Sequence, residues 1–272
     1  MDTYTKAAYL TSKLVTNEYS TSFGLSIRLF EPALRPHIYA IYGLVRIADE
    51  IVDTYKGPQA AKILDRFEKE ISQALVENYS TNPIIYAYVI TAQRYDIPED
   101  LLAAFFTSMR MDLTAQTYDQ QKYETYIYGS AEVVGLLCLR VFADDANLYE
   151  TLADGARHLG AAYQKVNFLR DIAADHDELE RWYFPEGSYN TFDEAAKAHI
   201  IAEISYDFEK GREALVQLPR SSRKAVALSY HYYQLLLKKI ESTPATVLKQ
   251  QRVRIPNVRK LLLLCLVAIR GR

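Results

Sequence analysis

Residues 164–175 carry four oxygen-bearing side chains at helical spacing. Gln164, Asn167, Asp171 and Asp175 follow one another at steps of three, four and four residues. At about 100° per residue, these side chains fall in a narrow arc on one helix face. Two carboxylates one turn apart repel each other, most strongly in a poorly hydrated cleft. The pair therefore calls for a cation, and carboxylate and amide oxygens suit a hard ion such as Mg2+.

Residues 42–53 repeat this pattern. Tyr42, Arg46, Asp49 and Asp53 share one helix face, and apolar residues occupy most of the remaining positions. If the two polar stripes face each other, four carboxylates converge and bind several divalent ions. Through those ions the site would hold a polyanion. A diphosphate is the best candidate, because Mg2+ at protein sites commonly completes its octahedron with phosphate oxygens and water.

The alternative is that both stripes are ordinary solvated helix faces, which is the usual meaning of an isolated Asp-x-x-x-Asp. Two stripes with cationic and amide neighbours in apolar surroundings favour a buried polyanion site instead. Arg46, Arg170 and Arg181 could clamp a diphosphate bidentately, or each could be an ordinary ion-pair partner.

The composition indicates a globular protein with a sizeable core. Of 272 residues, 49% are hydrophobic and 24% are charged, which argues against disorder. A net charge of −2 argues against nucleic acid as a partner, because phosphate backbones are normally met by a basic face. Cys138 and Cys265 both lie in apolar runs without metal or redox spacing, so we expect small buried side chains.

Helical periodicity covers almost the whole chain, and no run alternates cleanly enough to form a sheet. The sequence predicts one all-α domain over residues 1–272, with proline at or near many helix junctions. We expect helices at 3–19, 33–55, 59–79, 83–95, 99–115, 120–143, 146–178, 191–217, 221–242 and 257–270.

The two chain ends bear on location. The N-terminus lacks a charged-then-apolar signal pattern, so we expect a cytoplasmic protein. The longest apolar run, 261–269, is far shorter than the roughly 20 residues that span a bilayer. We expect it to be a core helix, with an interfacial contact as the alternative.

Several further segments are too polar or too small for their apolar surroundings. The hydroxyl groups of residues 19–24 could cap the next helix or donate to phosphate oxygens. The small residues of 128–135 permit close helix approach or leave room for a bulky ligand. The 22 tyrosines either line helix packing or border a cavity where a carbocation forms.

Taken in order, these segments resemble the squalene/phytoene synthase family of head-to-head prenyl transferases. The resemblance covers most of the chain. It rests on Ser20-Thr-Ser22-Phe23, Tyr42-x-x-x-Arg46-x-x-Asp49-Glu50-x-x-Asp53, Tyr128-Gly-Ser-Ala-Glu-Val-Val-Gly135, Gln164-x-x-Asn167-x-x-Arg170-Asp171-x-x-x-Asp175, Arg181-x-Tyr183-Phe-Pro185, Tyr233-x-x-x-Leu237 and Arg252-Val-Arg254…Lys260-Leu261.

The resemblance implies the isoprenoid-synthase helical bundle around a central apolar cavity, with the two acidic helices facing each other. It implies Mg2+ held by Asp49, Asp53, Asn167, Asp171 and Asp175, with Gln164 beside them. Ser20, Ser22, Arg46, Arg170 and Arg181 would bind or orient the diphosphates. Phe23 would contact a prenyl chain or diphosphate. The side chains bordering the reacting carbons and the departing pyrophosphate would be Tyr42, Tyr128, Tyr183 and Tyr233.

The implied reaction joins two allylic prenyl diphosphates through a cyclopropylcarbinyl diphosphate. The segment at 128–135 looks most like bacterial phytoene synthases, which favours two C20 geranylgeranyl diphosphates and phytoene. Squalene or dehydrosqualene synthesis from C15 farnesyl diphosphate is the alternative, with NADPH needed only for squalene. Other classes left open are a non-catalytic scaffold homologue and a terpene cyclase. The oligomeric state and peripheral membrane contact are also open.

The chain departs from the family pattern at four positions. Glu50 follows the leading aspartate of the first motif, where a second Asp is common. Tyr19 stands where a His often precedes the serines, and Glu132 replaces a small residue. His176 lies at a variable position. None of these changes removes a residue that the implied mechanism needs.

Overall fold

The computed structural model describes residues 1–55, 57–114, 117–143, 145–179 and 181–270, and helices dominate all of these ranges. The only β pairing among the described residues is an isolated bridge between Thr117 and Trp182. The all-α prediction is therefore confirmed. The helices are α1 Thr3–Tyr19, α2 Thr21–Ile27, α3 Arg35–Asp53, α4 Ala60–Glu77, α5 Pro83–Arg94, α6 Glu99–Asp112, α7 Gln120–Ile127, the π-helical turn η1 Tyr128–Glu132, α8 Val133–Phe142, α9 Ala146–Leu179, α10 Glu194–Leu215, α11 Arg220–Glu241, α12 Ala245–Leu248 and α13 Asn257–Arg270.

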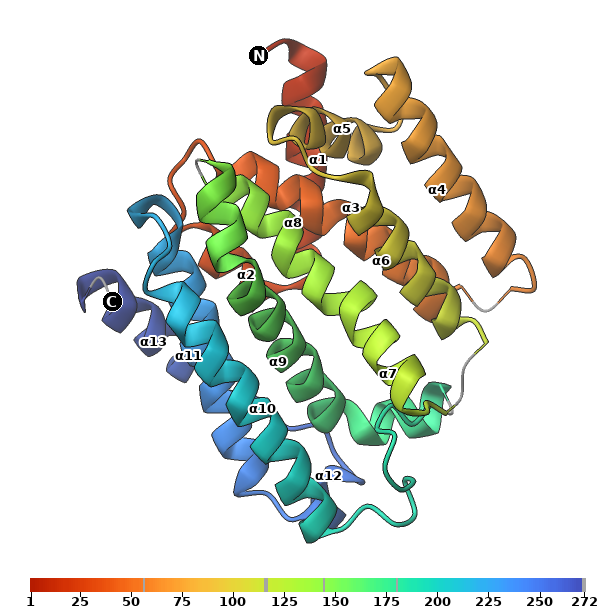
Figure 1. Cartoon of the computed structure of the whole chain (residues 1–272), viewed down its shortest axis with the longest axis vertical. Coiled ribbons are helices and arrows are strands. Elements are labelled where there is room, and N and C mark those ends of the chain that lie inside the picture. The colour runs from red at the N-terminus through yellow and green to blue at the C-terminus, as the bar shows by residue number, and fades with distance from the viewer. Residues whose placement is uncertain (56, 115–116, 144, 180, 271–272) are drawn as a thin grey trace.

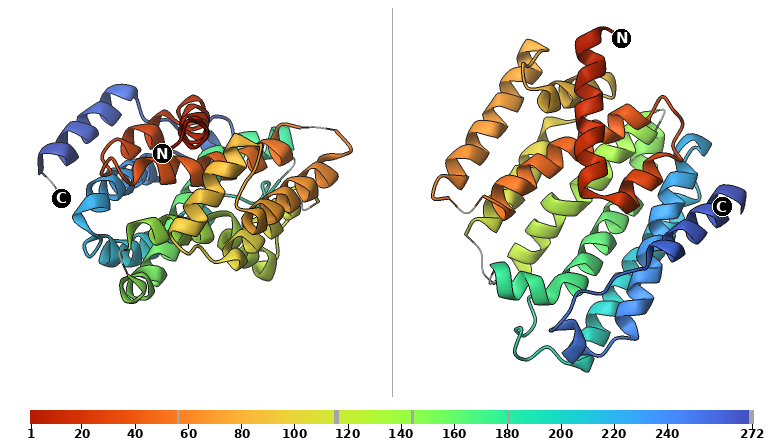
Figure 2. Two further views of the ribbon diagram at one scale, coloured as in Figure 1. Left: turned by 90° about the horizontal axis from the view of Figure 1, so that it is seen from above. Right: turned by 180° about the vertical axis from the view of Figure 1, so that it is seen from behind.

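The long helix α9 lies at the centre of the bundle (Figure 1) and packs against α8, η1, α10 and α11. Helix α3 packs against α1, α5 and α6 on the N-terminal side of the molecule. Helices α1, α2 and α13 lie together on the face seen from behind (Figure 2, right), and α2 contacts both of the others. The helices of the two acidic stripes, α3 and α9, thus belong to one bundle.

Two large hydrophobic clusters stabilise this arrangement. One gathers around α3 to α6 and α8, and the other around α7 and α9 to α13. Partly buried Leu29 and Val226 pack against both clusters, so apolar packing is continuous between them. Fully burying an aliphatic or aromatic side chain contributes about 1.5–3 kcal/mol, and these clusters contain dozens of such groups.

The structure adds helical elements that periodicity did not predict. Helix α2, seven residues long, and helix α12, four residues long, are too short to show a clear repeat. Ser20 caps α2, because its hydroxyl accepts a hydrogen bond from the Phe23 amide at 3.2 Å. The capping interpretation of residues 19–24 is therefore correct for this serine.

The helix expected at 120–143 is divided by the π-helical turn η1. Gly129 lies in this turn, and a Cβ there would come within 1.8 Å of the Ser108 hydroxyl oxygen on α6. Gly135 of α8 is similarly close to α9, since its Cβ would lie 2.5 Å from the Ala156 carbonyl oxygen. The small residues of this segment do permit close helix approach.

The C-terminal apolar run is only partly buried. In α13, Val267 is buried and Leu263 and Leu264 pack partly against the core. Leu262 and Leu266 are exposed, so the core expectation is wrong for these two residues. The side chains of Leu261, Cys265, Ala268 and Ile269 lie outside the described part of the structure.

One helical run within the described ranges, Gln120–Phe142, is long and apolar enough to cross a membrane. More than half of its apolar window, 56%, is buried inside the protein. A buried core helix has the same composition, so this finding is weak support for a membrane span.

Candidate active site

A cavity of about 560 Å3 lies between α2, α3, α8, α9, α10, α11 and α13. Its lining changes along the helices. On α9 the lining residues from Leu152 to Gly160 are apolar or small, whereas those from Tyr163 to Arg170 are polar or aromatic. On α3 the lining changes from Ile38 to Tyr42, Arg46 and Asp49. The cavity therefore has a polar region near the C-terminal ends of both helices and an apolar body.

The acidic residues of α3 form ion pairs with arginines. Arg46 lies 3.7 Å from the Asp49 carboxylate and also pairs with Glu50 one turn later. Asp53, at the end of α3, accepts a hydrogen bond from the Arg181 guanidinium at 3.1 Å. The two Arg46 pairs lie within one helix, whereas the Arg181 pair joins α3 to the segment that follows α9.

On α9, two further arginines form ion pairs with Asp171. Arg170 contacts both carboxylate oxygens of Asp171, at 2.9 and 2.6 Å. Arg252, from the loop before α13, contacts the same two oxygens at 2.7 and 3.2 Å. One turn earlier, Tyr233 donates to the Asn167 amide oxygen at 3.3 Å and stacks on Tyr163 with ring centroids 4.1 Å apart. Helices α9 and α11 thus meet at this site.

The carboxylates of the two stripes share one electrostatic environment. Burial raises the pKa of Asp49 to about 8, and Asp53, Asp112 and Glu50 add to the rise while Arg46 opposes it. Burial raises the pKa of Asp175 to about 7, helped by Asp171 on the same helix and Asp53 on α3. Arg181 links the ends of the two acidic helices, because its guanidinium pairs with Asp53 and its backbone amide donates to the Asp175 carbonyl oxygen at 2.9 Å.

This charge distribution fits a hard cation. Among the described residues, no three His, Cys, Asp or Glu side chains form a ready-made metal cluster. Arginines partner Asp49, Asp53 and Asp171 instead. Burial, together with neighbouring carboxylates, nevertheless raises the pKa of Asp49 and of Asp175, so an added cation would favour their ionised forms. Buried carboxylate and amide oxygens are the ligands that suit Mg2+.

A buried carboxylate, that of Asp112, shares Arg181 with Asp53 of the α3 stripe. Asp112, at the end of α6, lies 3.3 Å from Arg181 and accepts a hydrogen bond from the Tyr126 hydroxyl at 2.8 Å. Arg181 also donates to the Asp112 carbonyl oxygen at 2.6 Å and to the Tyr183 hydroxyl at 3.3 Å. Sequence reasoning missed Asp112. An acidic residue ending a mostly apolar helix was the available signal.

The structure brings most of the predicted site residues to this cavity. Those that line it are Ser20, Phe23, Tyr42, Arg46, Asp49, Gln164, Asn167, Arg170 and Tyr233. Asp53, Asp171, Asp175, Arg181 and Tyr183 lie outside the lining. Asp171 contacts the lining residues Arg170 and Arg252, whereas Asp53 and Tyr183 contact Arg181. Tyr128 also lies outside, with its ring 5.4 Å from the Arg157 guanidinium. The side chain of Ser22 is not among those described.

The lining includes residues to which sequence reasoning gave no role. Arg252 and Lys260 were part of the C-terminal motif, and the structure places both in the wall. Tyr163 and Ser130 also line the cavity, and their buried hydroxyls have no hydrogen-bond partner among the described residues. Ser130 belongs to the small-residue segment 128–135, which the sequence had already marked, whereas only the three-dimensional arrangement identifies Tyr163.

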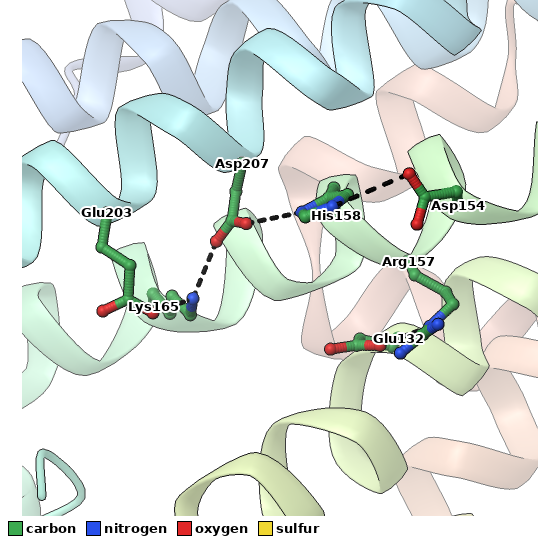
Figure 3. A network of polar contacts seen from close by, with 7 residues as sticks. All are labelled: Glu132, Asp154, Arg157, His158, Lys165, Glu203 and Asp207. Atoms are coloured by element: carbon green, nitrogen blue, oxygen red, sulfur yellow. Dashed lines mark hydrogen bonds and ion pairs between the residues drawn. The ribbon is translucent and has the colours of Figure 1, made fainter. Parts of the chain in front are cut away.

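The four departures from the family pattern have local explanations. The Arg46 guanidinium lies 4.4 Å from the centre of the Tyr19 ring, where a cation–π contact is favourable. Glu50 pairs with the same arginine. His176 stacks on Tyr189. Glu132 pairs with Arg157 at 2.7 Å (Figure 3) and does not line the cavity.

The face of α9 toward α10 carries a second charged group (Figure 3), and none of its residues lines the cavity. Lys165 lies 2.8 Å from Asp207 and also pairs with Glu203. The second oxygen of Asp207 lies 2.7 Å from His158. Lys165 and Asp207 are both buried, so this network fixes α9 against α10.

Comparison with known proteins identifies the family of this chain and the class of its fold. The squalene/phytoene synthase family model matches residues 16–259, and the chain belongs to that family. Its members are prenyltransferase-type synthases. A crystal structure of a dehydrosqualene synthase in complex with ligand superimposes with a TM-score of 0.82 at 18% identity, covering 98% of this chain and 97% of that one.

Two relatives show how the similarity is distributed. Presqualene diphosphate synthase of Zymomonas mobilis is 33% identical over 177 residues, which cover 63% of this chain and only 58% of that protein. The 15-cis-phytoene synthase of Synechocystis is 27% identical over an alignment of 292 positions, covering 97% of this chain and 85% of that protein.

Proposed function

We propose that this protein condenses two allylic prenyl diphosphates head to head, through a cyclopropylcarbinyl diphosphate. The supporting observation is the cavity, because its acidic and arginine-rich region adjoins a long apolar body. A prenyl diphosphate has the same two-part character. Our first choice of substrate is geranylgeranyl diphosphate and our first choice of product is phytoene, supported by the Synechocystis 15-cis-phytoene synthase that aligns along 97% of the chain.

The polar region supplies the groups for binding the diphosphates. Arg46, Arg170 and Lys260 line the cavity and carry positive charge, and guanidinium groups bind phosphate oxygens bidentately. Arg170 currently pairs with Asp171 and Arg46 with Asp49. A diphosphate would compete for these arginines and leave the carboxylates free for metal ions.

Mg2+ is proposed to bind through Asp49, Asp53, Asn167, Asp171 and Asp175, where it would neutralise the diphosphate charge and assist its departure. The protein's own residues would do the remaining work. Gln164 would orient the diphosphate beside these ligands. Arg181 would hold Asp53 in place, since it is anchored to Asp112.

Aromatic rings and apolar walls would protect the cationic intermediates. Tyr42 stacks on Phe23 with centroids 5.0 Å apart, and both line the cavity. Tyr233 lies on the opposite helix, α11. The faces of these rings favour positive charge, and the aliphatic walls exclude water that would quench an allylic cation. Loss of a proton at the end of the reaction gives phytoene.

A C15 reaction is the second candidate. The Zymomonas presqualene diphosphate synthase shows higher identity, 33%, over its shorter aligned region. On this alternative, two farnesyl diphosphates would give the cyclopropylcarbinyl diphosphate, dehydrosqualene, or squalene when NADPH delivers hydride. A scaffold role would leave the clustered carboxylates without a use.

Product analysis tests these possibilities directly. Purified protein is incubated with Mg2+ and labelled C15 or C20 diphosphate, with and without NADPH, and the lipids are extracted. We expect phytoene from the C20 substrate without NADPH. A C30 product from the C15 substrate alone would replace our first choice with the second. No Mg2+-dependent pyrophosphate release from either substrate would overturn the enzymatic proposal, and a cyclic product from one molecule would indicate a terpene cyclase.

A further inference from the structure

The C-terminal segment differs in charge from the rest of the chain. Residues 242–272 contain seven Lys and Arg residues and no Asp or Glu. The first 241 residues therefore hold 25 basic and 34 acidic residues. A protein with a net charge of −2 thus carries one strongly basic region, which includes α13 and the loop before it.

Helix α13 presents an exposed apolar stripe. Val258, Leu262 and Leu266 are 70%, 58% and 48% exposed and follow one another at steps of four residues. They therefore lie on one helix face. Arg259, also exposed, lies next to Val258 in the chain. This face is apolar and flanked by positive charge.

The opposite face of α13 belongs to the cavity and the core. Lys260 and Leu263 line the cavity, and Val267 is buried. The helix packs against α11 and α2. Helix α1, which lies on the same side of the molecule (Figure 2, right), exposes Leu10 and Leu14. One helix thus separates the cavity from an exposed apolar surface.

We propose that the exposed face of α13, together with the exposed side chains of Arg254 and Arg259, forms a docking surface for an anionic lipid bilayer. An amphipathic helix with an apolar face and neighbouring Lys and Arg lies in the plane of the membrane interface. Each basic residue near an anionic leaflet favours binding. At 14 residues, α13 is too short to span a bilayer, so it would lie on the surface.

Charge favours a bilayer over a second copy of the chain as the occupant. A two-fold symmetric dimer through this surface would place the same patch against itself. The basic residues of the two copies would then face each other without an acidic residue from either segment. An anionic leaflet would instead place negative charge opposite Arg254 and Arg259.

Docking in this way would bring the cavity wall to the interface. This consequence depends on the proposed function, since lipid-soluble prenyl substrates and hydrocarbon products concentrate in membranes. Binding to the bilayer does not depend on it, because the stripe and the charges are features of the free protein.

Vesicle sedimentation tests the docking surface without substrate or Mg2+. We expect binding to vesicles that contain phosphatidylglycerol, weak binding to pure phosphatidylcholine, and loss of binding at high salt. Leu262→Ser should lower the partition coefficient about tenfold, because a leucine side chain no longer enters the interface. Arg254→Gln with Arg259→Gln should lower it about thirtyfold. Val76→Ser, which removes an 81% exposed valine from α4, is the matched control and should change nothing.

Several outcomes would overturn the docking surface: no vesicle binding, equal binding to neutral and anionic vesicles, or binding that the three substitutions leave unchanged. A dimer that Leu262→Ser converts to monomers, without vesicle binding, would show that a second copy covers the stripe. Circular dichroism checks the fold of each variant. Failure of the catalytic proposal remains distinguishable, because a protein that binds vesicles but turns over no prenyl diphosphate contradicts only that proposal.

Discussion

The two charged faces of α9 differ in how completely their charges are paired. Toward α10, Lys165 and His158 both contact Asp207, and the lysine and the aspartate are buried (Figure 3). The cavity face is the face of α9 on which Asp171 and Asp175 continue the row of Gln164 and Asn167, two residues that line the cavity. Here Asp171 has two arginine partners, yet Asp175 one turn later makes no ion pair among the described residues. On the α10 face the buried lysine and aspartate are paired with each other, whereas on the cavity face one carboxylate has no ionic partner among the described residues.

This difference separates charges that hold the fold from charges suited to a ligand. A buried charge must be paired to be tolerated, and the α10 face meets that condition within the protein itself. On the cavity face the pKa of Asp175 is raised to about 7. That carboxylate gains from any added cation, so burial together with missing positive charge marks the candidate site.

Removing a charge from the cavity face should have the largest effect on activity. We expect Asp171→Asn to lower kcat about 1,000-fold, the upper range for losing one preorganised electrostatic group. Thermal unfolding should change little, because the substitution keeps the shape of the side chain. Turnover of the C20 substrate and a melting curve measure the two effects.

Asp154→Asn is the matched control for that experiment. It removes an exposed carboxylate from the same helix, where Asp154 lies 3.8 Å from His158. We expect normal turnover. If Asp171→Asn were as active as this control, Asp171 would have no place in the site.

Removing a charge from the α10 face should reverse the pattern. Lys165→Met keeps the aliphatic stem but leaves buried Asp207 without its lysine, which should cost about 3 kcal/mol of unfolding free energy. The melting temperature should fall by about 5–10 °C, while kcat below the transition stays within about twofold. Adding Asp207→Asn should restore part of the loss. A large drop in kcat without destabilisation would show that the two faces are not separable.

The pH should affect metal binding at the cavity face. Ligating carboxylates must be ionised, and burial raises the pKa of Asp49 to about 8 and that of Asp175 to about 7. In the metal-free protein both therefore hold protons at lower pH. We expect Mg2+ to bind at least about tenfold more tightly at about pH 8.5 than at about pH 6.5. Calorimetric titration measures this, and an affinity independent of pH would contradict the proposed ligands.

The sequence alone predicts one of these faces better than the other. Carboxylates and amides at helical spacing, such as Asp49 and Asp171, indicate a site because repeated like charges are unusual in apolar surroundings. Most long helices follow from periodicity in the same way. Lys165 and Asp207 carry no such signal, since their pairing depends on the packing of α9 against α10. Short helices such as α2 and the π-helical turn also depend on tertiary contacts.

Asp112 tests whether a buried residue behind the cavity face tunes metal binding. Arg181 is shared between Asp112, at 3.3 Å, and Asp53, at 3.1 Å. In Asp112→Asn the guanidinium keeps its bond to the residue 112 carbonyl but loses one carboxylate, so it should pair more strongly with Asp53. Because Asp53 is 41% exposed, that gain is worth less than 1 kcal/mol.

We therefore expect the Mg2+ concentration for half-maximal activity to rise only about threefold, with kcat at saturating Mg2+ unchanged. Asp65→Asn, which removes an exposed partner of Arg110, is the control. A fall in kcat that excess Mg2+ does not correct would mean that Asp112 acts on more than Arg181. Asp112 would then act at the candidate site itself, like Asp171 and Asp175, and not only through Arg181.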